Sequence, residues 1–320
     1  MAPTLRAAVV AACGIFALAC AEARGPSVTP ILEALAAPVD SLKRTFTAPT
    51  SVHETQSGLV VLNDVAEEML LRERIAGDTL VPVTTRGQGP LEVRMVQRIH
   101  RGPGDSLWVM DLPGNKVIVL DHEGRPVREM RSPFAPSVVA AMGGGGLRAI
   151  STAGDWYVGE RRMRFTPTFE ADDSMSVVRW RQRDGTRDTL ARIAVRPINF
   201  TSPGTPPTID AFTPIDAWGV FRDGRVIVVR PDYAVELIDA DGRVTRAGRG
   251  PAEPLPLTRA DAELTRDSLA RQRAETLRMM PGNPMGGQAS VTPGGRPAAV
   301  LPDPLPAHWP ILRGDMVSVD

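Results

Sequence analysis

The chain has 320 residues, 42% of them hydrophobic, and its 37 basic and 37 acidic residues leave no net charge. This balance excludes the strong positive field that draws a protein onto nucleic acid or an anionic membrane, so no nucleic-acid partner is expected. The 30 prolines and 29 glycines favour many turns over long helices and indicate an all-β class.

The N-terminus has the pattern of a secretory signal. Arg6 precedes an apolar run from Ala7 to Ala19, which is shorter than the roughly 20 residues that span a bilayer. We therefore expect residues 1–19 to be a signal peptide. The mature protein should be exported, either to the periplasm or outer membrane as a lipoprotein, or secreted.

Cys20 is the candidate lipidation site. The run Ala17-Leu18-Ala19-Cys20 resembles a bacterial lipobox, so cleavage after Ala19 would leave Cys20 as the first residue and the acceptor of a lipid anchor. Ordinary cleavage at the Ala-x-Ala pattern of residues 19–21 is the alternative. Once the signal containing Cys13 is removed, Cys20 has no partner for an internal disulfide.

Residues 20–56 are expected to be a leader or linker, and residues 57–320 a repeated β structure. The clearest unit runs from Gly104 to Met130 and is typical of three short strands joined by turns, two of them apolar on both faces. A shift of 118 residues places Leu107–Met110 on Arg225–Val228 and the turn Asp121–Arg125 on Asp239–Arg243. Repeated units of this size favour a β-propeller.

Counting the units predicts four blades and the start of a fifth. The blades are expected near Gly58–Thr85, Ile99–Arg131, Ile150–Val195 and Trp218–Ala247, with a further strand at Met316–Val319. This count predicts a propeller that is incomplete in this chain, with surfaces open to association. The alternative is a complete four- or five-bladed ring in which the N-terminal segment supplies the missing strand.

Some of these runs carry a family resemblance. Asp111, Asn115-Lys116-Val117 and Asp121-x-x-Gly124 are similar to the NHL blade pattern, and Gly89-Pro90-Leu91-Glu92-Val93 resembles a Gly-Pro-Gly-Glu-Phe run of bacterial envelope propellers. The chain therefore resembles the six-bladed β-propeller proteins of bacterial envelopes, relatives of the NHL-repeat group. The resemblance implies a six-bladed type of fold more strongly than it implies any ligand.

One segment interrupts the β pattern. Residues 258–280 lack a strand period and are rich in helix formers, with Thr258 and Asp261 placed as a capping pair, so we expect an inserted helix packed over the propeller. Residues 281–310 are rich in proline and glycine and are expected to form a loop.

The sequence predicts no catalytic residue, metal site or cofactor. The four histidines, His53, His100, His122 and His308, form no local metal motif, and no Gly-x-Ser-x-Gly elbow is present. Tryptophans such as Trp108 and Trp156 are expected to pack between blades rather than line a ligand channel. Three acidic residues at strand ends could still face a central channel and hold a cation: Asp111, Asp155 and Asp216.

Three functions follow as hypotheses. The first is a non-catalytic binding or scaffolding propeller of the cell envelope, with an envelope protein or small molecule as its ligand. The second is a metal-dependent hydrolase or lyase of the lactonase or NHL-lyase kind, with its site in the central channel. The third is a purely structural envelope component.

Overall fold

The structure is a computed structural model, and it describes residues 46, 49–64, 69–74, 81–94, 96–111, 114–132, 145–165, 169–199, 208–210, 212–249, 255–279 and 298–309. The chain divides into two units, Met1–Ala37 and Pro38–Asp320, and every described residue belongs to the second. The predicted signal peptide, Cys20 and the strand expected at Met316–Val319 lie outside the described residues.

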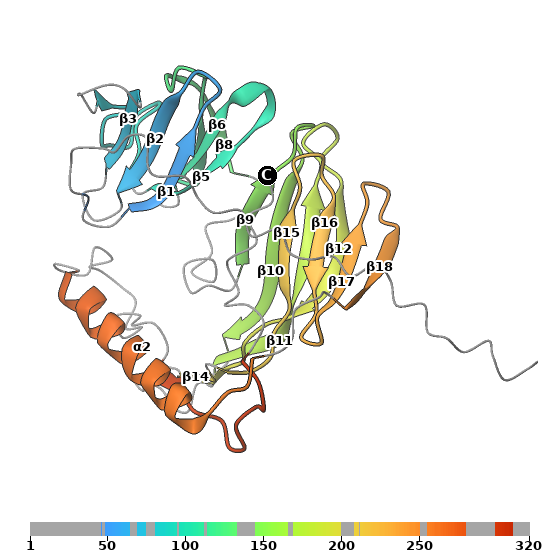
Figure 1. Ribbon diagram of the computed structural model, residues 1–320. Helices are drawn as coiled ribbons and strands as arrows, with labels where there is room; N and C mark the ends of the chain where they lie inside the picture. The colour runs from blue at the N-terminus through green and yellow to red at the C-terminus, as the bar shows by residue number, and fades with distance from the viewer. Residues whose placement is uncertain are drawn as a thin grey trace, which may run out of the picture. The chain divides into compact units, whose positions relative to one another are not determined.

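Four antiparallel sheets of four strands follow one another along the chain, each with its strands in sequence order (Figure 1). Blade 1 holds β1 (Pro49–Glu54), β2 (Leu59–Asp64), β3 (Met69–Arg74) and β4 (Val81–Pro82). Blade 2 holds β5 (Val96–Arg101), β6 (Leu107–Asp111), β7 (Lys116–Leu120) and β8 (Pro126–Arg131). Blade 3 holds β9 (Gly145–Ile150), β10 (Trp156–Phe165), β11 (Phe169–Trp180) and β12 (Arg187–Ala194), and blade 4 holds β15 (Ala217–Val220), β16 (Val226–Val229), β17 (Ala234–Ile238) and β18 (Val244–Arg249). The fold is an all-β propeller.

Successive blades pack face to face through their middle strands. Every residue of β6 and β7 is buried, because alternate side chains enter two different cores. Leu107 and Val109 pack against blade 1, whereas Trp108 and Met110 pack against blade 3. A third core joins blades 3 and 4 around Trp218. The apolar run in β6 therefore binds two neighbours at once, as its sequence predicts.

The two hairpins matched by the 118-residue shift have the same geometry. Asp121 Oδ1 accepts the N–H groups of Glu123 and Arg125 at 2.9 Å, and Asp239 Oδ1 accepts the equivalent N–H groups two and four residues on at 3.0 and 2.8 Å. Gly124 and Gly242 close these turns with φ of 69° and 83°, a region that favours glycine. The predicted repeat is confirmed at the level of hydrogen bonds.

The expectation of a six-bladed fold is wrong for the described chain, which builds four blades. After β18 the sequence stops alternating, and the chain forms helix α2 (Arg259–Met279) instead of a further sheet. Strand β19 (Ala298–Val300) then pairs in parallel with β14 (Thr208–Asp210), which pairs with β13 (Ile198–Asn199) in a separate three-stranded sheet. A 3-10 turn, η1 (Pro103–Asp105), completes the described elements.

Helix α2 begins at the predicted capping pair. Thr258 Oγ1 accepts the Asp261 N–H at 3.2 Å and donates to Asp261 Oδ2 at 2.5 Å. The helix buries Ala262 in a small core with Phe212 and Leu257, with Trp309 packed beside them. Its described contacts are thus with the β14–β19 region. None of the described helices combines the length and the apolar character needed to cross a bilayer.

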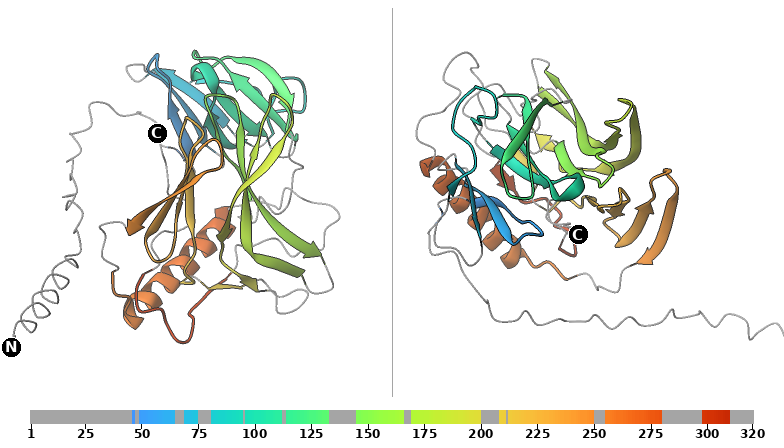
Figure 2. Two further views of the ribbon diagram at one scale, coloured as in Figure 1. Left: turned by 90° about the vertical axis from the view of Figure 1, so that its right-hand side faces the viewer. Right: turned by 90° about the horizontal axis from the view of Figure 1, so that it is seen from above.

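Two boundaries differ from the sequence expectation. Strand β1 lies in the stretch expected to be a leader. It was not expected as a strand because its polar sequence PTSVHE has no apolar period. Strand β19 lies in the stretch 281–310 that was expected to form a loop. Strands β10 and β11 are long, and their pairing continues to Phe165 opposite Phe169. Figure 2 shows the resulting twist and length of the blade 3 hairpin. Strand β1 and the long β10–β11 hairpin both carry residues of the candidate sites.

Candidate functional site

The first strands of the four blades meet in what we call the hub, defined as β1, β5, β9 and β15. Strand β5 lies beside β1 and β9, and β15 lies beside β9. These strands carry fewer apolar side chains than the middle strands, and several of their charged side chains lie near one another. The hub therefore gathers polar groups from blades that are distant in the sequence.

A series of hydrogen bonds links each first strand to the next. His53 Nε2 on β1 donates to the Ile99 carbonyl on β5 at 2.8 Å. His100 on β5 bonds the backbone of Arg148 on β9. Arg148 in turn donates through Nη2 to the Trp218 carbonyl on β15 at 3.5 Å, with its guanidinium 5.8 Å from the Trp218 ring centroid. Each link connects a side chain of one blade to the following blade.

The hub is electropositive around a neutral histidine. The pKa of His100 is lowered from 6.5 to about 3, chiefly by burial and then by the charges of Arg98, His53 and Arg148, against the opposing effect of the Arg148 backbone hydrogen bond. His100 is 6% exposed and is uncharged at neutral pH. Arg98 is exposed and Arg148 half-buried, and the charges of both permanent cations reach His100. Guanidinium groups in this setting suit an anionic ligand.

The acidic residues proposed as cation ligands have local structural roles. Asp111 Oδ1 accepts the Arg94 N–H at 3.3 Å. Asp216 Oδ2 accepts the Ala194 N–H at 2.7 Å and pairs with Arg230 at 2.7 Å. Asp155 closes a turn through its backbone, and its N–H donates to Ser151 Oγ at 3.2 Å. Among the residues that the structure describes, no group of three or more His, Cys, Asp or Glu is placed to hold a metal.

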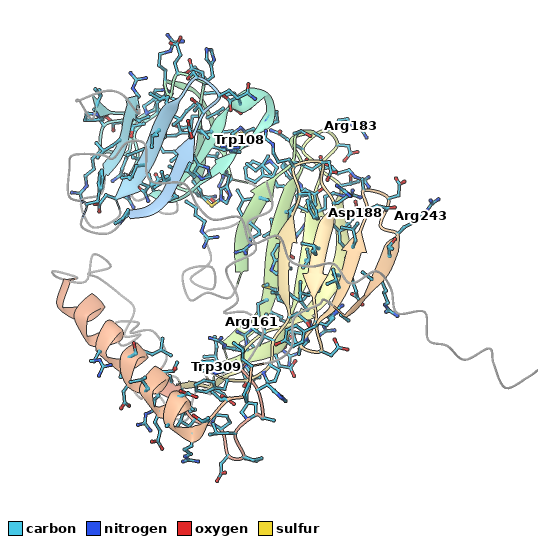
Figure 3. All side chains as sticks on the ribbon, viewed as in Figure 1. Trp108, Arg161, Arg183, Asp188, Arg243 and Trp309 are labelled. Atoms are coloured by element: carbon cyan, nitrogen blue, oxygen red, sulfur yellow. The ribbon has the colours of Figure 1, made fainter. Side chains whose placement is uncertain are left out.

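The prediction that tryptophans pack between blades is confirmed for Trp108 and Trp156. Their ring centroids are 5.4 Å apart at 76°, in the core between blades 2 and 3, and Trp180 lies 5.8 Å from Trp156. Trp309 differs, because it packs edge to face on Phe212 beside α2. Figure 3 shows Trp108 in blade 2 and Trp309 near the helix.

Sequence reasoning missed the hub residues. His53 and His100 are scattered in the sequence, and only the adjacency of β1 and β5 brings them together. Arg98 and Arg148 lie on first strands whose polar character gave no strand signal. The one available signal was position, since each lies a few residues before a recognisable apolar strand of the same blade.

Comparison with known proteins gives distant structural likenesses. No protein-family model and no curated protein sequence matches the chain. Solved structures similar to it include virginiamycin B lyase of Staphylococcus aureus (13% identity, 64% of this chain and 56% of that one, TM-score 0.34). A candidate exported protein of Bacteroides fragilis is 11% identical over 67% of this chain and 52% of that one, with a TM-score of 0.38. A gluconolactonase of Xanthomonas campestris is 12% identical over 65% of this chain and 78% of that one, with a TM-score of 0.31. The chain thus spans about half the length of the first two, and the propeller assignment rests on its own sheets.

Proposed function

We propose that this chain is an exported, lipid-anchored β-propeller that acts as a non-catalytic binding module of the bacterial cell envelope and binds an anionic group at the hub. The observation that carries the proposal is the clustering of Arg98 and Arg148 beside His53 and the neutral His100. An anion at the hub would be attracted by the charges of two guanidinium groups that come from different blades.

The binding step is tested with inorganic phosphate and citrate as probes. Isothermal titration of the purified mature protein should show saturable binding that weakens at least tenfold in Arg98→Gln, because a hydrogen bond to a charged group contributes about 1.5–3 kcal/mol. Arg131→Gln is the matched control, since Arg131 is an exposed arginine on the last strand of the same blade. Equal weakening in both variants, or no binding of either probe, would refute an anion site at the hub.

The anchor is tested at Cys20. Cleavage at the lipobox should leave two or more acyl chains on Cys20, enough for stable membrane attachment, and Cys20→Ser should move the protein into the soluble fraction. A wild-type protein that is already soluble and begins at Glu22 would contradict lipidation. The metal-dependent hydrolase or lyase remains the alternative function, and metal analysis of the purified protein tests it.

A further inference from the structure

Blade 3 extends beyond the blade that covers it. Strands β10 and β11 have 10 and 12 residues, whereas the equivalent β6 and β7 of blade 2 have 5 each. Trp156 and Val158 at the start of β10 pack into the core with blade 2. Glu160 and Arg162 follow on the same face of β10. The sheet face changes there from apolar to polar.

A pocket lies on this polar face. Its volume is about 140 Å³, and its lining consists of Glu160, Arg162, Asp172, Ser174, Ser176 and Arg192. Glu160, Ser176 and Arg192 oppose one another directly across β10, β11 and β12, which places their side chains about 5 Å apart in one row. We call this feature the blade 3 pocket.

Hydrogen bonds from a buried arginine hold the backbone beside the blade 3 pocket in place. A register shift in β10 and β11 falls between Arg161 and Met163. The buried Arg161 donates through Nε to the Asp172 carbonyl at 2.6 Å and through Nη2 to the Arg196 carbonyl at 2.9 Å. Figure 3 shows Arg161 towards the opposite end of the sheet from Arg183 and Asp188. These bonds hold the irregular segment that carries Asp172.

The lining matches a ligand that both donates and accepts hydrogen bonds. Two guanidinium groups supply donors, two carboxylates supply acceptors, and the two serine hydroxyls can do either. Arg192 Nε already donates to Ser174 Oγ at 2.8 Å, and Glu160 pairs with Arg187. The lining has no net charge, so it favours neither a simple anion nor a simple cation. Neighbouring hydroxyl groups on an uncharged ligand can form hydrogen bonds with the guanidinium, carboxylate and hydroxyl groups of the lining alike.

The volume limits the size of that ligand. A volume of about 140 Å³ is well below the ≈ 300–1,000 Å³ of a site for a drug-sized ligand, so the pocket takes a small ligand or one unit of a larger one. We propose that the blade 3 pocket binds one neutral sugar unit of a saccharide through its vicinal hydroxyls. This site is separate from the hub and uses residues that the proposed anion site does not.

The test uses saturation-transfer NMR on the purified mature protein with methyl glucoside, methyl galactoside and N-acetylglucosamine. At least one should bind saturably in the millimolar range, and Ser176→Val and Arg192→Gln should each weaken its binding at least fivefold. Thr189→Val is the matched control, because Thr189 is an exposed hydroxyl residue of β12 outside the lining. Melting temperatures of the three variants confirm that each is folded.

Three outcomes would overturn the proposal. One is the absence of binding for all three sugars. Another is sugar binding that both pocket variants leave unchanged. The third is a pocket that takes up inorganic phosphate or glycine more tightly than any sugar, since that would indicate a charged or zwitterionic ligand. Loss of phosphate binding in Arg98→Gln has no bearing on these results, because Arg98 does not line the pocket.

Discussion

Mild acid should destabilise the protein through His100. In the folded chain the pKa of this imidazole is about 3, compared with 6.5 when it is solvated. Between these two values the unfolded chain binds a proton that the folded chain does not. The free energy of unfolding is therefore greatest above pH 6.5, falls as the pH is lowered through this window, and stops falling from this cause near pH 3.

The size of the effect follows from the pKa difference. One pKa unit corresponds to about 1.4 kcal/mol, so the loss is about 2 kcal/mol at pH 5 and about 5 kcal/mol over the whole window. The carboxyl groups whose pKa is lowered on folding, such as Asp121 and Glu129, have ordinary values of 3.8 and 4.5. They contribute mainly below pH 5. The interval from pH 7 to pH 5 therefore reports chiefly on histidine.

Urea unfolding at pH 7 and pH 5 measures this loss in three proteins. The wild type and His122→Gln, which alters an exposed histidine in a hairpin turn, should each lose about 2 kcal/mol more than His100→Gln between the two pH values. An equal loss in all three proteins would refute the reasoning. If His100→Gln does not fold, NMR titration of the wild-type His100 ring gives its pKa directly, and a value near 6.5 would equally refute it.

Three further predictions concern turns and contacts, each measured by urea unfolding at pH 7. Gly224→Ala should cost more stability than Gly242→Ala. Both glycines have φ above 80°, which alone costs an alanine about 1–2 kcal/mol, but only at Gly224 would the added Cβ also lie 2.6 Å from a tyrosine hydroxyl. Equal costs, or a cost of only about 1–2 kcal/mol for Gly224→Ala, would contradict this. Thr258→Ala should cost about 1 kcal/mol through loss of the α2 cap, and no loss would mean that the cap adds nothing. Glu129→Gln should cost about 1 kcal/mol, because Glu129 accepts hydrogen bonds from Lys116 and a loop N–H; an unchanged midpoint would show those bonds to be dispensable.

The middle strands could be predicted because two cores bury them. A run such as Leu107–Met110 is apolar on both faces, and the turn at Asp121 marks where β7 ends and β8 begins. The first strands could not be predicted in the same way. Strand β5 has the sequence VQRIHR, and only Val96 and Ile99 enter the core with blade 1. With few apolar positions there is no period to detect, so hub strands such as β1 and β5 could not be recognised from the sequence.

The length of the blade 3 hairpin could not be predicted for a related reason. Residues 163–174 mix charged, aromatic and proline residues, a composition typical of a loop. In the structure the pairing nevertheless continues through Met163 opposite Ala171 to Phe165 opposite Phe169. Backbone pairing to a neighbouring strand needs no apolar period in the sequence. An extension of a well-anchored hairpin can therefore look like a loop in the sequence.

The net charge of the chain gave no indication of the candidate hub site, because a total says nothing about where positive and negative side chains cluster. Many acidic side chains are committed to turns: Asp121, Asp223 and Asp239 each accept N–H groups of their own hairpins. Others form ion pairs within a blade, as Asp188 does with Arg179. Arg98 and Arg148 lie on first strands, and both of their charges act on His100. A neutral chain can in this way hold a locally basic hub, and a local field of that kind is what attracts a small anion.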